Sequence, residues 1–177
     1  RWGEGNAYTA WLKNRGVKTD LSEYPVENHH TTWCSHKAME FIGKEHSGPW
    51  MLNVNYYDPH MPFDPPLEYL KRYSPGAVPP PQYRESDLVQ QDALSEVYFQ
   101  TQAADPDTFD IQEKKAAYFA MIELLDNSIG QLIEALDQTG QRENTIIVFM
   151  SDHGEMLGDH GLLLKGCRFY EGLVRVP

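Results

Sequence analysis

Cysteine is scarce in this chain, which has only Cys34 and Cys167 among 177 residues. Two cysteines are too few for a disulfide framework, and their separation excludes a CxxC metal pair. Their pairing and the redox compartment are left open. The chain also lacks any run of about 18 apolar residues, so no membrane-spanning helix is predicted. Its first ten residues, RWGEGNAYTA, lack the basic and then apolar pattern of a signal peptide.

Positive charge is the second shortage. Fifteen Lys and Arg residues stand against 26 Asp and Glu residues, which gives a formal net charge of −11. None of the basic residues forms a block, whereas binding to a nucleic-acid backbone needs clustered Lys and Arg. We therefore expect no nucleic-acid partner. The length and the 41% hydrophobic content predict a single domain, residues 1–177, or one large piece of a larger domain.

Two apolar segments end in polar residues of the kind that bind ligands. Residues 146–150, IIVFM, lead directly into Ser151-Asp152-His153-Gly154, and residues 50–57, WMLNVNYY, lead into Asp58-Pro59-His60. Both segments are predicted to be strands, and the strand at 146–150 is predicted to be buried. A long helix between them favours an α/β fold with a mainly parallel sheet. Ligands of such sheets bind at the carboxyl ends of the strands.

Three helices are predicted. The strongest covers 110–137, because apolar residues recur at helical spacing from Ala117 to Leu136, with Asp110 as N-cap and Gly140 as the stop. A short helix begins at Ala7 and is closed by Gly16. A third covers 33–42 and is capped by Thr31 or Thr32. By contrast, residues 73–109 show little periodicity and predict a long loop excursion with one short helix near 92–98.

The histidines outside these elements permit two interpretations each. Adjacent side chains point to opposite sides of an extended chain, so His29 and His30 are predicted to be surface residues rather than a pair of metal ligands. His60 lies in a segment with four prolines between 59 and 66, which fix the backbone. This loop can hold His60 in a site, or it can be a turn with a surface histidine.

Asp152 and His153 could hold a metal ion at the end of the predicted strand. Carboxylate oxygens suit Ca²⁺ and Mg²⁺, while imidazole suits Zn²⁺ and Mn²⁺. The spacing of His153 and His160 is not the i, i+4 pattern of zinc proteases. Two ligands do not complete a site, so a metal role and a turn rich in polar residues both stay open from spacing alone.

Several motifs in order resemble the sulfatase family of the alkaline phosphatase superfamily, which includes arylsulfatases, choline sulfatases and phosphonate monoester hydrolases. The stretch SDHGEMLGDHGLLLKG, followed by YEGLVRVP, is similar to the second half of the family signature. Residues 50–66 resemble its strand and DPH-x-P-F loop, and 118–126 resemble the helix before the metal strand. The resemblance covers 30–177. It implies part of an alkaline-phosphatase-like three-layer sandwich, with a mainly parallel sheet flanked by helices.

The resemblance also implies roles for single residues. Asp152 matches the metal-binding Asp, and His153 stands where the family has a residue that binds the metal or contacts the nucleophile. Lys165 matches the Lys that binds sulfate or phosphate oxygens, and His60 matches the His that meets the ester oxygen or leaving group. A fixed cation and fixed donors suit a dianionic transition state. Glu155, Asp159 and His160 are expected to shape the loop by hydrogen bonds rather than to bind the metal.

The family nucleophile, a formylglycine made from Cys or Ser in a C/S-x-P-x-R motif, is not found around Cys34 or Cys167. The first-strand acidic pair of the metal site is also missing. We therefore expect an internal fragment of a sulfatase whose parent hydrolyses a sulfate ester with a divalent metal and formylglycine. The fragment alone should be inactive, with weak or absent metal binding. The alternatives are a phosphonate or phosphate ester hydrolase of the superfamily and a non-catalytic fragment or binding module that keeps the fold.

The same resemblance implies the ligands. Ca²⁺ is the expected ion, with Mg²⁺, Mn²⁺ and Zn²⁺ as alternatives, and the expected partner is a sulfate-ester small molecule or glycan. The sequence sets neither the individual ester nor the oligomeric state. The cellular compartment stays open as well. The sequence is compatible with a soluble parent protein that is secreted or periplasmic.

Overall fold

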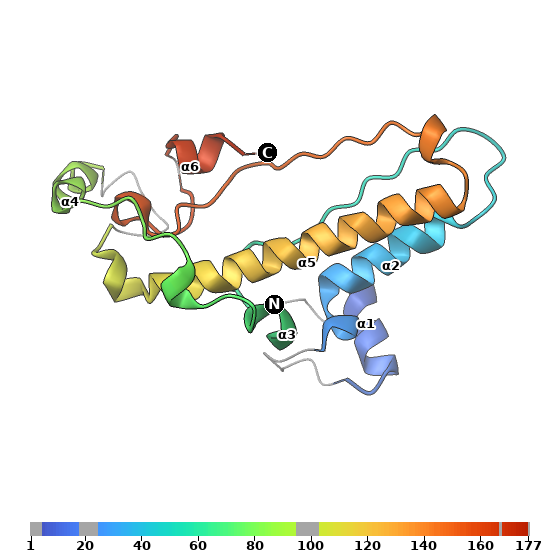
Figure 1. Ribbon diagram of the computed structural model, residues 1–177, viewed down its shortest axis with the longest axis horizontal. Helices are drawn as coiled ribbons and strands as arrows, with labels where there is room; N and C mark the ends of the chain where they lie inside the picture. Colours follow the sequence, from blue (N-terminus) through green and yellow to red (C-terminus); the bar gives the residue numbers. More distant parts are fainter. Residues whose placement is uncertain (1–4, 18–24, 95–102, 167, 177) are drawn as a thin grey trace. The chain divides into compact units, whose positions relative to one another are not determined.

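The computed structural model describes residues 5–17, 25–94, 103–166 and 168–176. By their internal contacts the residues form two compact units. Unit 1 comprises Arg1–Tyr73 and Ala117–Thr145, and unit 2 comprises Ser74–Ala116 and Ile146–Pro177. One of the divisions between the units, before Ala117, lies within the long helix α5, which Figure 1 labels. The α-helices are α1 (Ala7–Asn14), α2 (His30–Ile42), α3 (Leu67–Leu70), α4 (Glu85–Asp92), α5 (Ile111–Gln138) and α6 (Glu171–Val174). Short 3-10 helices lie at Val26–Asn28, Pro75–Ala77, Pro106–Phe109, Arg142–Asn144 and Asp159–Gly161.

The helices follow the local signals closely. Asn6 caps α1 by accepting a hydrogen bond from Thr9 N at 2.8 Å, and Gly16 ends it with φ +71°. The predicted helix 110–137 is α5, and Gly140 follows it with φ +67°. Helix α2 begins earlier than predicted, because the N-cap is His29, whose Nδ1 accepts from Thr31 N. The predicted caps Thr31 and Thr32 are therefore wrong, and both lie inside the helix.

Each unit has its own small apolar cluster. In unit 1, Tyr69 packs with Ala120 and Leu124 of α5. In unit 2, Met156 packs with Leu162 and Leu173. The helix α4 lies earlier in the chain than the short helix predicted near 92–98, and residues 95–98 of that prediction lie outside the described residues. No helix among the described residues is long and apolar enough to cross a membrane.

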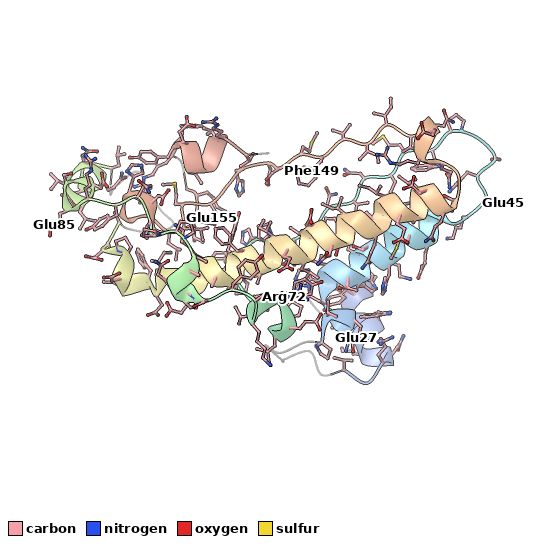
Figure 2. The ribbon with its side chains drawn as sticks, viewed as in Figure 1. Glu27, Glu45, Arg72, Glu85, Phe149 and Glu155 are labelled. Atoms are coloured by element: carbon pink, nitrogen blue, oxygen red, sulfur yellow. The ribbon has the colours of Figure 1, made fainter. Side chains whose placement is uncertain are left out.

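The two predicted strands are not formed within the described residues. Residues 50–57 and 146–150 are drawn as extended chain without arrows (Figure 1). The prediction that 146–150 is buried is wrong, since Ile146 is 93% and Phe149 65% exposed. Side chains project from this segment around Phe149 (Figure 2). A strand forms only when its backbone pairs with a neighbour, and these segments have no ladder here. The parallel sheet is therefore not confirmed by the structure itself.

Candidate active site

The turn after residue 150 arranges Asp152 and His153 by local hydrogen bonds. Asp152 Oδ1 accepts from the backbone N–H of His153 at 3.0 Å. The ring nitrogen Nδ1 of His153 lies 2.8 Å from the Gly154 carbonyl oxygen. Because a carbonyl only accepts, Nδ1 carries the proton, and a neutral ring then has its lone pair on Nε2. This Nε2 is 3.6 Å from Asp152 Oδ2, so two donor atoms of metal-ligand type are neighbours.

These two residues share a cavity with Lys165. The cavity has a volume of about 330 Å³ and lies within unit 2. Asp152 is 86% exposed and His153 40% exposed at the side chain, so both are open to a ligand in solution. The other lining residues are Gly166, Arg168, Phe169, Leu173 and Val174. The structure thus brings together three of the four residues predicted for the site.

Backbone pairing holds the loop that carries this cavity. Gly154 N donates to the Leu173 carbonyl at 2.8 Å, and Met156 N donates to the Leu164 carbonyl at 3.1 Å. A Cβ added at Gly154 would collide with the Gly172 carbonyl oxygen, so only glycine permits this approach. The segments before and after the loop are therefore held closely together beside the cavity.

The remaining acidic and histidine residues of the motif serve the loop, as the sequence predicts. Asp159 Oδ1 accepts from Gln82 N at 2.8 Å, which ties the loop to the excursion. The His160 ring stacks on Tyr170 with centroids 4.2 Å apart, and its Nδ1 lies 3.5 Å from Asp87 Oδ1 of α4. Burial raises the pKa of the Glu155 carboxyl, while the charge of Lys165 opposes this shift. Glu155 is also labelled in Figure 2.

His60, the fourth residue predicted for the site, belongs to unit 1. Its Nδ1 lies 2.6 Å from the Met61 carbonyl oxygen, so Nδ1 donates and Nε2 is left as the acceptor of a neutral ring. The Tyr57 ring lies 4.9 Å from the His60 ring, and Tyr57 Oη donates to the same Met61 carbonyl. The loop therefore fixes the orientation of His60. Its approach to Asp152 stays a prediction.

The sequence interpretation missed one group of side chains that could hold a metal ion, namely His29, His30 and Asp58 in unit 1. The prediction that His29 and His30 are surface residues is wrong for His29, which is 2% exposed. Burial, with a smaller effect of His30, lowers the pKa of His29 to about 3, and a hydrogen bond with the Asp64 backbone opposes this shift. Burial raises the pKa of Asp58 to about 7, opposed by its hydrogen bond from Thr31. The adjacent histidines begin a helix, where the extended-chain argument does not apply.

With the geometry in place, comparison with known proteins identifies the family. The Sulfatase family model matches residues 1–177. The chain belongs to the sulfatase family. It is 32% identical over 155 residues to an arylsulfatase of Clostridium perfringens, covering 87% of this chain and 32% of that protein. It is 36% identical over 181 residues to a choline-sulfatase of Rhizobium meliloti, covering 94% of this chain and 35% of that protein.

The sulfatase chain is also similar to a solved structure. A phosphonate monoester hydrolase of Agrobacterium radiobacter superposes with a TM-score of 0.82 at 25% identity, covering 94% of this chain and 39% of the other. The family match and the sulfatase relatives confirm the resemblance to the sulfatase family. The chain spans about a third of the length of these curated relatives.

Proposed function

We propose that the sulfatase containing this chain hydrolyses a sulfate ester, and that the cavity formed by Asp152, His153 and Lys165 is part of its active site. The single observation that carries the proposal is that Asp152, His153 and Lys165 line one cavity of about 330 Å³. The relatives named arylsulfatase and choline-sulfatase support this reaction class. We infer a small-molecule or glycan sulfate ester as the substrate.

A divalent cation suits the Asp152 and His153 pair. Their Oδ2 and Nε2 atoms are 3.6 Å apart, and the Nδ1 proton is fixed by the Gly154 carbonyl, so both face outward as ligands. Ca²⁺ is the ion we propose, with Mg²⁺, Mn²⁺ and Zn²⁺ as alternatives. Since Ca²⁺ takes six to eight oxygen ligands, the pair supplies only part of a coordination shell, and other ligands must complete it. Such an ion would stabilise negative charge on the ester group.

Lys165 and His60 complete the proposed chemistry. The Lys165 ammonium, on the same cavity as Asp152, would bind the sulfate oxygens as their charge develops. His60, held through Nδ1 by the Met61 carbonyl, would take up a proton from solvent at Nε2, and the imidazolium would give that proton to the ester oxygen as the bond to sulfur breaks. We propose that the two residues converge on Asp152 in the parent protein.

The finer architecture is also a proposal. We infer an alkaline-phosphatase-like three-layer sandwich in the parent, with residues 50–57 and 146–150 as strands of a mainly parallel sheet. The similarity to the phosphonate monoester hydrolase supports this fold. The exposed apolar side chains of 146–150 support it too, because they would be buried once helices cover both faces of a sheet.

Turnover by the purified parent protein tests the proposal. We expect hydrolysis of an aryl sulfate, lost by far more than about 100-fold in Asp152→Ala, since even outer-shell metal partners are worth about 10–100-fold. The matched control is Asp137→Ala, at an exposed carboxylate of α5. The 177-residue chain alone should show no turnover. Unchanged activity in Asp152→Ala would remove Asp152 from the site.

A phosphonate or phosphate ester hydrolase is the second candidate, favoured by the likeness to the Agrobacterium enzyme. Parallel assays with an aryl sulfate and an aryl phosphonate monoester separate the two. A higher kcat/KM for the phosphonate would replace the sulfatase proposal while leaving the site in place. Absence of turnover with both esters would favour a binding module.

A further inference from the structure

Unit 1 holds a second group of ligand-type side chains, His29, His30 and Asp58. One donor atom from each lies within 4.8 Å of the others. His30 Nε2 is 3.3 Å from Asp58 Oδ1, and His29 Nδ1 is 3.6 Å from Asp58 Oδ2. In a tetrahedral site with metal–ligand bonds of about 2.0–2.1 Å, neighbouring ligand atoms are about 3.3–3.4 Å apart. The two observed separations, which end on different oxygens of Asp58, are of similar length.

Two of the three side chains are buried, and the Asp58 carboxylate is incompletely bonded. The Asp58 side chain is 0% exposed, and its Oδ1 makes no hydrogen bond among the described residues. His29 is 2% exposed, so its ring is shielded from water. His30 Nε2 approaches Oδ1 without hydrogen-bond geometry. Buried polar atoms normally find partners, and a bound cation would supply one for Asp58 Oδ1.

The surrounding structure holds the group in place without a ligand. The two histidines follow each other at the beginning of α2, and their rings lie 4.1 Å apart. Thr31 Oγ1 donates to Asp58 Oδ2 at 2.5 Å, which orients the carboxylate against the helix. Thr31 itself is fully buried. A cation would therefore meet ligands that packing has already ordered.

We propose that His29, His30 and Asp58 bind Zn²⁺. Two imidazoles and one carboxylate form a donor set that suits zinc and is poor for Ca²⁺, which prefers oxygen ligands. Three protein ligands leave a fourth position for water or a small anion. His30 and Thr31 also line a cavity of about 240 Å³ with Tyr8 and Tyr57, so the group borders a cavity on the His30 side. The inference does not depend on the proposed role of Asp152.

Zinc binding to the 177-residue chain tests this site. The chain is dialysed against a chelator, and Zn²⁺ is titrated in the presence of excess Ca²⁺ by calorimetry. We expect one Zn²⁺ per chain, and Co²⁺ in its place should give the visible absorption of a tetrahedral ion. His30→Gln should weaken binding by more than the roughly 10–100-fold that loss of an outer-shell partner costs. His36→Gln, at an exposed position of the same helix, is the matched control and should bind as wild type.

Two further variants test whether Asp152 or Cys34 contributes a ligand to the zinc ion. Asp152→Asn and Cys34→Ser should both leave zinc binding unchanged, because neither side chain belongs to the group. A wild-type chain that binds no Zn²⁺ above background overturns the proposal whether or not any variant folds. Equal affinities for His30→Gln and His36→Gln would overturn it as well. The group would then be a buried hydrogen-bonded cluster.

Discussion

Both units place aspartate beside histidine, but in opposite surroundings. In unit 1 the Asp58 side chain is fully buried against His29 and His30, whereas in unit 2 the Asp152 side chain is 86% exposed beside His153. Burial alters the protonation of the first group, raising the pKa of Asp58 to about 7 and lowering that of His29 to about 3. A buried group has ligands ordered by packing but little room for a substrate. The exposed pair is open to an ester but needs additional ligands.

The first prediction, with the largest expected effect, concerns the buried packing of unit 1. Leu124 is 2% exposed and packs with Tyr69 and Ala120 of unit 1. Leu124→Ala should reduce the free energy of unfolding by about 2–5 kcal/mol, because a cavity replaces buried side-chain contacts. Urea unfolding followed by circular dichroism measures it. Ile122→Ala, two positions earlier and 42% exposed, is the control and should cost much less. Equal losses would mean that α5 is not packed as described.

The second prediction concerns function in unit 2. Lys165→Ala should lower kcat/KM of the parent for an aryl sulfate by about 100- to 1,000-fold, the effect of removing one donor to developing negative charge. The loss should fall mainly on kcat if Lys165 acts in the transition state. Lys71→Ala, at an exposed lysine of unit 1, should leave both constants unchanged. A change in KM alone would instead indicate that Lys165 binds substrate and transition state equally.

The third prediction concerns acid stability, measured in chelator. Unfolded His29 takes up a proton near pH 6.5, but folded His29 does so only near pH 3. Between these values the unfolded state holds more protons, so the free energy of unfolding falls as pH is lowered, by up to about 1.4 kcal/mol per pH unit. This contribution is complete above pH 6.5. Asp58 acts in the opposite direction, since its folded carboxyl keeps a proton between about pH 3.8 and 7.

His29→Asn isolates the histidine from these opposing effects. Asparagine preserves an N-cap for α2, and His30 and Asp58 remain in place. The variant should therefore lose less stability than the wild type between pH 6.5 and 4.5 in urea unfolding. Parallel curves for the two proteins would show that His29 is protonated in the folded state. A steeper curve for the variant would contradict the assigned direction.

Features that depend on neighbouring residues were predictable from the sequence, and features that depend on distant ones were not. Helical periodicity gave α5 within one residue at each end, and Gly16 gave the end of α1. The predicted cap of α2 was wrong because His29 is the N-cap. His29 lies beside Asp58, which is 29 residues later in the chain and could not be placed there from local sequence. The grouping of Asp152, His153 and Lys165 follows from one short motif. Its completion by His60 involves another unit and stays a prediction.

The smallest expected effect tests the extended segment itself. Val148 is 68% exposed, so Val148→Ala should change the free energy of unfolding of the 177-residue chain by no more than about 0.5 kcal/mol. In a parent with a completed sheet the same side chain would be buried, and loss of two methylene equivalents should cost roughly 1.5 kcal/mol. Urea unfolding of Val148→Ala in both proteins compares the same substitution in the exposed and the buried setting. An apolar side chain contributes to the free energy of unfolding only when another element buries it. A small cost in both proteins would therefore mean that residues 146–150 are not a covered strand in the parent.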